Sequence, residues 1–227
     1  MIFIYLFLLF TATAASSMEM DPSTQKLIEE YRKLSLEDAK GKISTSIGFD
    51  KSYDLKVLIH LFGDQISQDE KNKYLLHCYA RPYSAPLILG LGANANVHNK
   101  CECISSALSG LPNSCKKYSI LHEAAERGNP AVVKALLEYK AHVDARDDKQ
   151  ETALMKACHL QQINGYRGDN RYIGHYTLTI EYLLKAGADE FLTNAAGKTA
   201  LQIAQTEIAN LQHREIIVKY LSNKKIA

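Results

Sequence analysis

The side chains with the clearest potential for chemistry gather between His98 and Cys115 of this 227-residue chain. His98, Cys101, Cys103 and Cys115 match a tetrahedral zinc site in number and ligand type. Only one residue separates Cys101 from Cys103, whereas close thiolate pairs on zinc have about two to four residues between them. The spacing therefore favours free thiols in a loop, with a disulfide from Cys101 or Cys103 to Cys115 as the alternative in an oxidising compartment.

Two histidines and two aspartates are further candidates. His77 and His122 each end the similar segments YLLH and SILH, and both suit a hydrogen-bonded histidine that ties its turn to a neighbouring repeat better than a metal ligand or base. Asp147 and Asp148 form a carboxylate pair that we expect to be solvated at the tip of a loop. No Gly-x-Ser-x-Gly, His-Glu-x-x-His, Walker or kinase motif occurs. The sequence thus predicts a non-enzyme without cofactor or small-molecule substrate.

The composition argues against nucleic acid as a partner. The chain has 27 Lys and Arg against 25 Asp and Glu, a net charge of +2, and we find no basic patch longer than Lys224-Lys225, which is typical of a solvated tail. The five cysteines do not pair evenly. Since Cys78 and Cys158 fall at apolar positions, the cysteine count suits a reducing compartment better than a disulfide framework.

The N-terminal segment instead has features of an exported protein. Residues 2–10 are an unbroken apolar run, followed by an Ala-x-Ala pattern at 12–14. This order resembles a secretory signal peptide and is short for a membrane span, which needs about 20 apolar residues. No Lys or Arg precedes the run, so a true start at Met18 or Met20 is the alternative. The first interpretation predicts a secreted or exported protein and the second a cytoplasmic one; membrane contact requires that residues 1–17 stay as an anchor.

The most informative pattern is internal repetition. Four segments share one apolar motif: SILHEAA (119–125), TALMKAC (152–158), TALQIA (199–204) and, more weakly, YLLHCYA (74–80). Ser119 and Thr152 are 33 residues apart, while Thr152 and Thr199 are 47 apart, which is the same period with 14 inserted residues. The insertions leave the motifs intact, as expected when the motifs lie on packed helices and the insertions lie in loops.

Each copy predicts a pair of helices. Three copies begin with a side-chain oxygen that can cap a helix start, from Ser119, Thr152 and Thr199. In the clearest copy, Gly128-Asn129 ends the first helix and Pro130 suits the first turn of a second helix, 130–139. The second helix carries an apolar stripe of Val132, Val133, Leu136 and Leu137. A single pair cannot bury its stripe but stacked pairs can, so the period predicts a solenoid.

These motifs, with the second series GLGANAN (90–96), YKAHVDA (139–145) and KAGADEF (185–191), resemble the ankyrin repeat. They echo its consensus Thr-Pro-Leu-His-x-Ala-Ala and Gly-Ala-Asp-x-Asn. Two departures are the missing proline, replaced by Ile120, Ala153 or Ala200, and Lys140 in place of a glycine. The resemblance implies an all-α fold, an ankyrin-repeat solenoid of stacked helix-turn-helix units with protruding hairpin fingers and an N-terminal helical cap.

Two amphipathic helices are expected before the repeats, at 23–36 and 52–62. The apolar spacing of 52–62 copies that of 130–139, as in the outer helix of a decayed repeat. We therefore predict a leader or mis-assigned start, a helical cap, an ankyrin-repeat domain and a tail, at 1–17, 18–70, 71–222 and 223–227. The expected repeats lie at about 74–98, 117–149, 150–194 and 197–222.

The resemblance implies a scaffold that binds another protein through the inner helices and fingers of a concave side. The matching inner-helix positions are Glu123, Glu126, Arg127, Lys156 and His159, and the matching finger positions are Arg146, Asp147, Asp148, Lys149 and Gln150. The irregular insertions are similar to those of ankyrin proteins from host-associated bacteria, which implies a bacterial secreted or host-directed protein. The alternative function is a thiol- or zinc-regulated protein centred on the loop of Cys101, Cys103 and Cys115.

A second insertion, residues 161–176, is rich in Tyr, Arg, Asn and Gly. These residue types are common at recognition surfaces. The segment is either such a surface or a tolerated excursion in the turn between the two helices of one repeat.

Overall fold

The computed structural model describes residues 22–98, 118–159, 173–208 and 211–222. Four sequence predictions lie outside the described residues: the leader at 1–17, the cysteines at 101, 103 and 115, most of the 161–176 insertion, and the tail at 223–227. Within the described ranges the chain is helical, without a β-strand, and no helix there combines the length and apolarity needed to cross a membrane. His98 and Ser119 form an isolated antiparallel bridge.

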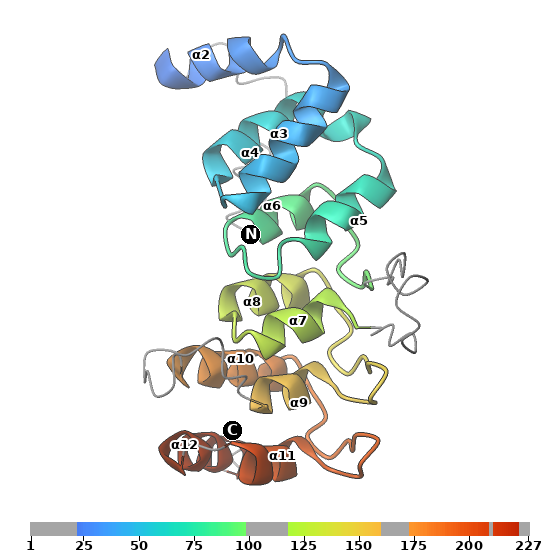
Figure 1. Cartoon of the computed structure of the whole chain (residues 1–227), viewed down its shortest axis with the longest axis vertical. Helices are drawn as coiled ribbons and strands as arrows, with labels where there is room; N and C mark the ends of the chain where they lie inside the picture. The colour runs from blue at the N-terminus through green and yellow to red at the C-terminus, as the bar shows by residue number, and fades with distance from the viewer. Residues whose placement is uncertain (1–21, 99–117, 160–172, 209–210, 223–227) are drawn as a thin grey trace, which may run out of the picture.

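The helices form a stack of pairs, shown in Figure 1 from α2 at the top to α12 at the bottom. In chain order they are α2 (Pro22–Tyr31), α3 (Leu36–Gly48), α4 (Ser52–Phe62), the 3-10 turn η1 (Gly63–Gln65), α5 (Gln68–Leu76), α6 (Ser84–Gly90), α7 (Ile120–Glu126), α8 (Pro130–Glu138), α9 (Ala153–Cys158), α10 (Ile173–Lys185), α11 (Ala200–Glu207) and α12 (Leu211–Ser222). The paired helices are α3 with α4, α5 with α6, α7 with α8, α9 with α10, and α11 with α12.

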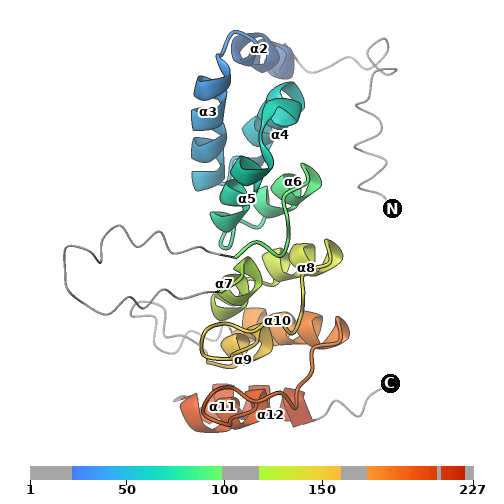
Figure 2. The same ribbon diagram turned by 90° about the vertical axis from the view of Figure 1, so that its right-hand side faces the viewer.

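Two rows of helices run along the stack. The inner row joins α7 to α9 and α9 to α11, while the outer row joins α4, α6, α8, α10 and α12 in series. Figure 2 shows the same stack from the side, with α2 packed at one end. The predicted solenoid is therefore confirmed, and the predicted helix at 52–62 is α4, which does extend the outer row.

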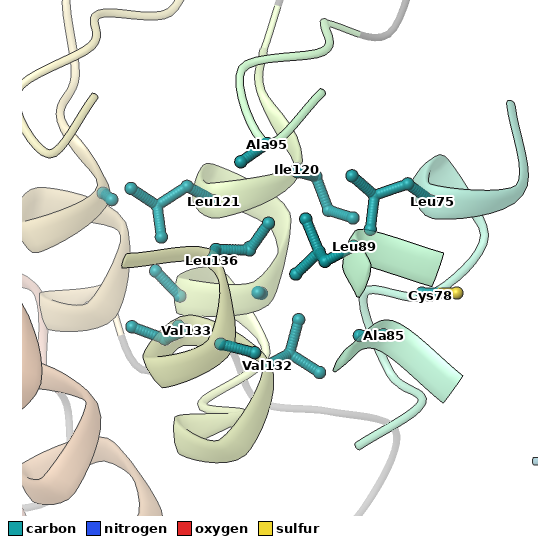
Figure 3. Close-up of a cluster of buried hydrophobic side chains, with 14 of the residues drawn as sticks. Leu75, Cys78, Ala85, Leu89, Ala95, Ile120, Leu121, Val132, Val133 and Leu136 are labelled. Carbon is teal, nitrogen blue, oxygen red and sulfur yellow. The ribbon is translucent and has the colours of Figure 1, made fainter. Parts of the chain in front are cut away.

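One continuous apolar core runs through the stack because each pair covers the stripe of its neighbour. Leu121, Val133, Leu154 and Leu184, which come from four successive helices of the repeats, are buried in the same cluster. Figure 3 shows the junction with the N-terminal pairs, where side chains of α5, α6, α7 and α8 gather in one cluster. Burial of this surface is the main stabilising contribution to the fold.

Polar side chains set the helix starts as predicted. Thr152 Oγ1 accepts from the backbone N–H of Met155 at 3.4 Å, and Thr199 Oγ1 accepts from that of Gln202 at 3.3 Å. Asn129 caps α8 through its Oδ1, which accepts from Val132 N–H at 3.3 Å. Each oxygen satisfies a backbone donor that has no partner inside its own helix.

Three outer helices end in the same way, at Gly92, Lys140 and Gly187. All three residues have positive φ, of 98°, 63° and 91° respectively. In each case this residue and the next donate backbone hydrogen bonds back to the last turn of the helix, as in Lys140 to Leu137 and Gly187 to Leu184. Lys140 thus keeps the left-handed conformation of the consensus glycine without being a glycine, which costs conformational energy.

A ladder of side-chain acceptors, one in α5 and two in turns, binds backbone N–H groups of successive turns along the stack. Asn72 Oδ1 accepts from Asn94 N–H at 2.8 Å. Asn96 Oδ1 accepts from His142 N–H at 2.7 Å, and Asp144 Oδ1 accepts from Asp189 N–H at 3.0 Å. The bases of the projecting turns therefore have a fixed spacing that does not depend on the apolar core alone.

The predicted helix at 23–36 is wrong in its extent, because the chain forms two helices there. α2 ends at Tyr31 and α3 begins at Leu36, a helix that the sequence analysis did not anticipate. Ser35 starts α3, since its Oγ accepts from Asp38 N–H at 3.2 Å. Gly41, Ser44 and Thr45 weaken the helical pattern of this segment.

The weak copy at 74–80 does not start a helix. α5 begins at Gln68 after the capping box of Ser67 and Glu70, which places Tyr74 in its last turn. His77 is exposed, and its Nδ1 lies 2.8 Å from the carbonyl oxygen of Lys73 in the same helix. The predicted role of His77 as a tie to a neighbouring repeat is therefore wrong.

Asp50, in the loop between α3 and α4, caps α6. Its Oδ1 accepts from the backbone N–H of Ser84 at 2.9 Å and from Ser84 Oγ at 2.6 Å. Asp50 has a φ of 52°, a strained value for a residue other than glycine. The N-cap residue of α6, Tyr83, supplies no side-chain cap, so Asp50 provides an acceptor from a distant segment.

Tyr176 corrects the prediction for the second insertion. It lies in α10 and is buried against the turn between α7 and α8. Its hydroxyl donates to the carbonyl oxygen of Glu126 at 3.1 Å, and a Cβ on Gly128 would stand 2.9 Å from its ring. Tyr176 is thus a packing residue between repeats.

The two cysteines at apolar positions are buried, as predicted. Cys78 and Cys158 are free thiols with no exposed surface. Burial raises the pKa of each thiol to about 12. Both therefore remain protonated and unreactive at neutral pH.

Candidate functional site

Two turns project from the inner side of the stack. The proximal finger, residues 146–151, connects α8 to α9, and the distal finger, residues 193–198, connects α10 to α11. The proximal finger contains five of the residues predicted to bind a partner.

Asp147 organises the proximal finger from inside. Its Oδ1 accepts from the backbone N–H groups of Lys149 and Glu151 at 2.9 and 2.8 Å, and its carbonyl accepts from Gln150 N–H at 3.0 Å. Only 5% of Asp147 is exposed, whereas Asp148 is exposed. The prediction of a solvated carboxylate pair is therefore wrong for Asp147, because its carboxylate is buried and accepts the backbone hydrogen bonds of the turn.

Lys156 of α9 neutralises this carboxylate. Its Nζ lies 2.8 Å from Asp147 Oδ2 and 2.8 Å from Glu151 Oε2, with 12% of the side chain exposed. Burial alone would lower the pKa of Lys156, but the hydrogen bonds to Asp147 and Glu151 outweigh it and raise the pKa above its ordinary value. Lys156 is thus an internal cation, not the exposed inner-helix residue that was predicted.

Glu151 completes the cluster and was missed by the sequence analysis. Its Oε1 lies 2.9 Å from His159 Nε2 and accepts from Asn194 Nδ2 at 3.4 Å. The hydrogen bond from His159, followed by that from Lys156, holds the pKa of Glu151 well below its usual range despite burial. The sequence signal for this role is slight, since Glu151 only precedes the helix cap Thr152.

His122 links the preceding repeat to this cluster, which confirms its predicted structural role. Its Nε2 lies 3.0 Å from the backbone carbonyl oxygen of Glu151, and its Nδ1 accepts from Ser119 N–H at 3.3 Å. A carbonyl can only accept and an N–H can only donate, so the ring is neutral with its proton on Nε2. Burial lowers the pKa of His122, in keeping with this neutral form.

Arg146 joins the two fingers. Its side chain is solvent-exposed, yet Nη1 donates to the carbonyl oxygens of Thr193 at 2.8 Å and Gln150 at 3.3 Å. The backbone N–H of Ala195 donates to the Lys149 carbonyl at 3.0 Å. The proximal and distal fingers are therefore directly hydrogen-bonded to each other.

The distal finger forms the same turn around an amide. Asn194 Oδ1 accepts from the backbone N–H groups of Ala196 and Lys198, both at 3.0 Å. Gly197, with a φ of 74°, occupies the place of Gln150, whose φ is 59°. Buried Ile203 stands in α11 where Lys156 stands in α9, so α11 offers no ammonium group from that position.

Two of the predicted inner-helix residues, Glu123 and Arg127, are already paired with each other. Glu123 and Arg127 form an ion pair at 2.7 Å, and the Arg127 guanidinium stacks 4.4 Å above the ring centroid of Tyr79. Glu126 is half-buried, with its carbonyl bound to Tyr176. The structure therefore leaves Asp148, Lys149 and Gln150 as the predicted residues that are exposed at the finger tip.

Among the described residues, no three His, Cys, Asp or Glu side chains are placed to hold a metal ion. The loop of Cys101, Cys103 and Cys115, on which the zinc or thiol alternative rests, is not part of the described structure. That alternative stays a prediction.

Helix pairs stacked in two rows, with hydrogen-bonded turns projecting on one side, define a helical repeat solenoid. Residues 85–167 match the family model for ankyrin repeats, which comprises three copies. The chain is an ankyrin-repeat protein, as the sequence motifs had indicated. None of the curated proteins compared with the chain matches it.

Proposed function

We propose that this protein is a non-enzymatic interaction module that binds a partner protein through its finger tips and inner helices. Ankyrin repeats are generally protein–protein interaction modules. The observation that supports the proposal most directly is the construction of the proximal finger. Asp148, Lys149 and Gln150 are exposed on a backbone that Asp147 and Lys156 hold from below. A surface ordered before binding loses little conformational entropy when a partner docks.

The proposed contact residues divide into two groups. Asp148, Lys149 and Gln150 would touch the partner, together with Glu126, His159 and the exposed edge of the Glu123–Arg127 pair. The remaining predicted residues, Arg146, Asp147 and Lys156, would act by placing the first group. Contacts between charged groups at an exposed tip affect association rate and salt dependence more than they affect affinity at high salt.

A charge-exchange variant tests the proposal. Asp148→Lys with Lys149→Asp reverses the finger-tip charges while keeping the net charge. Its matched control is Lys134→Glu with Glu138→Lys, which exchanges an exposed pair on the outer helix α8. Affinity capture from cell extracts should yield proteins bound by the wild type and the control but reduced at least about tenfold with the finger variant. Equal capture by both variants would remove the finger from the binding surface.

Export and a host-directed role form a separate part of the proposal and rest on residues 1–17 alone. N-terminal sequencing of protein recovered from cells and from the medium tests this part. A mature chain that begins soon after Ala14 and is found in the medium would support export. A chain beginning at Met1, Met18 or Met20 and confined to the cells would count against it.

A further inference from the structure

The charge cluster beneath the proximal finger consists of Asp147, Glu151 and Lys156. Their side chains are 2%, 6% and 12% exposed, so two carboxylates and one ammonium group are almost removed from water. Such groups tolerate burial only when every charge has partners. Here Lys156 bonds both carboxylates, and Asp147 and Glu151 also accept from backbone N–H groups and His159 respectively.

Lys156 is the member of the cluster that belongs to a helix. It lies in α9, whereas Asp147 and Glu151 lie at the two ends of the proximal finger. The bonds from one Nζ atom to both carboxylates therefore close the finger across its base and attach it to the inner row. Without Lys156, two buried negative charges would face each other.

The links between the two fingers all start from residues that this cluster positions. Arg146 precedes Asp147 and donates to Thr193, while the Lys149 carbonyl accepts from Ala195 N–H. Asn194 Nδ2 donates to Glu151 itself. A displacement of the proximal finger would therefore break its bonds to the distal finger at the same time.

We propose that Lys156 is a positioning residue for the binding face, which holds the proximal and distal fingers as one cooperative unit that opens and closes together. A partner would then meet a surface of two fingers set by a side chain that it does not need to touch. The part of this inference that concerns a partner rests on the proposed function, whereas the cooperative opening does not.

Native-state amide hydrogen exchange, measured by NMR on the full chain, tests the inference. Lys149 and Glu151 amides report on the proximal finger, and Ala196 and Lys198 amides report on the distal one. The amide of Ile203, bonded within α11, is the reference for opening of the helix stack. Each reporter amide has a defined acceptor, so its protection measures one hydrogen bond.

In Lys156→Met, exchange in both fingers should become at least about tenfold faster by a similar factor, and both fingers should still exchange faster than the Ile203 amide. Lys156→Arg, which keeps the charge, should restore most of the protection. Faster exchange in the proximal finger alone would show that the fingers open separately and would overturn the inference. Equal protection of the finger amides and of Ile203 would overturn it too, because the fingers would then open only when the entire stack unfolds.

Asp147→Asn provides a second variant in case Lys156→Met does not fold. The distal finger already forms the same turn around Asn194, so an amide at position 147 can keep the two backbone acceptor bonds and lose only the charge that Lys156 neutralises. This variant should also accelerate exchange in both fingers together, and unchanged Lys198 exchange would contradict the inference.

The experiment separates this inference from the proposed function. If the fingers exchange together but Asp148→Lys with Lys149→Asp captures the same proteins as the wild type, the cooperative unit stands and the binding face fails. If captured proteins are lost with that variant but the fingers exchange independently in Lys156→Met, the binding face stands and the cooperative unit fails.

Discussion

The proximal and distal fingers make the same backbone turn around residues of different charge. Asp147 accepts from two backbone N–H groups in one finger, and Asn194 accepts from the equivalent two groups in the other. The turn therefore requires an acceptor oxygen and a residue of positive φ three residues before the helix, but not a charge. The charge of Asp147 serves the separate purpose of binding Lys156.

The two repeats that contain these fingers also have different residue types at other equivalent positions. Lys140 stands where the next repeat has Gly187, and Val132 stands where it has Thr179. The residue found in one repeat can therefore be placed at the equivalent position of the other, because the first repeat already accommodates it in the same backbone.

The largest effect is expected from Lys156→Ile, which gives α9 the residue that α11 has as Ile203. Asp147 and Glu151 would be left as buried carboxylates without their cation. Removing one partner of such a pair costs about 3 kcal/mol of unfolding free energy. Urea denaturation of the variant and wild type measures the difference. A loss below about 1 kcal/mol would mean that the cluster is well solvated and the two fingers are anchored alike.

Acid should act on the proximal finger through Glu151. Its pKa in the folded protein lies below the 4.5 of the unfolded group, so its stabilisation is complete above that pH and is lost as the pH falls toward the folded value. Between pH 6 and pH 3, the wild type should lose about 2 kcal/mol more unfolding free energy than Glu151→Gln. Parallel pH profiles from denaturant titrations of the two proteins would contradict the ionised state of Glu151.

Thr179→Val should stabilise the protein by about 1 kcal/mol. Thr179 is fully buried, and its Oγ1 has no hydrogen-bond partner, whereas Val132 fills the equivalent place in α8 with a methyl group. Thermal unfolding compares the variants, and Val132→Thr is the reverse control, expected to destabilise. If Thr179→Val and Val132→Thr both raised the unfolding temperature, the two positions would not be equivalent.

Lys140→Gly should give the smallest effect, a gain of about 0.5 kcal/mol, because glycine adopts positive φ without steric cost. Gly187→Ala is the matched reverse change. A Cβ there would meet no atom within 4 Å, so any loss reports backbone strain alone. Differential scanning calorimetry can resolve both shifts, and a neutral Gly187→Ala would show that the left-handed turn is not strained.

Local patterns predicted much of the fold. Ser119, Thr152 and Thr199 start helices as expected, and α4 has the predicted bounds, because capping and apolar periodicity are encoded within a few residues. α3 was missed although Ser35 and Asp38 form a capping signal, since its apolar positions are diluted by Gly41 and small polar residues.

The candidate site was less predictable because its partners come from separate segments. Nothing near Asp147 in the sequence indicates that Lys156, nine residues later, returns beneath it. Arg146 has the composition of a surface contact, but its acceptor, Thr193, lies 47 residues away. The exposure of Asp148, Lys149 and Gln150 was predicted correctly because a turn tip has few neighbours to cover it.

Asp50 and the ladder of acceptors share a direction that bears on how the chain is built during translation. Asp50 precedes the Ser84 that it caps, and Asn72, Asn96 and Asp144 each precede their donors. In these four contacts the accepting side chain is therefore synthesised before the group that donates to it. Each new helix pair can dock onto a template that is waiting for it, which favours assembly from the N-terminus onward.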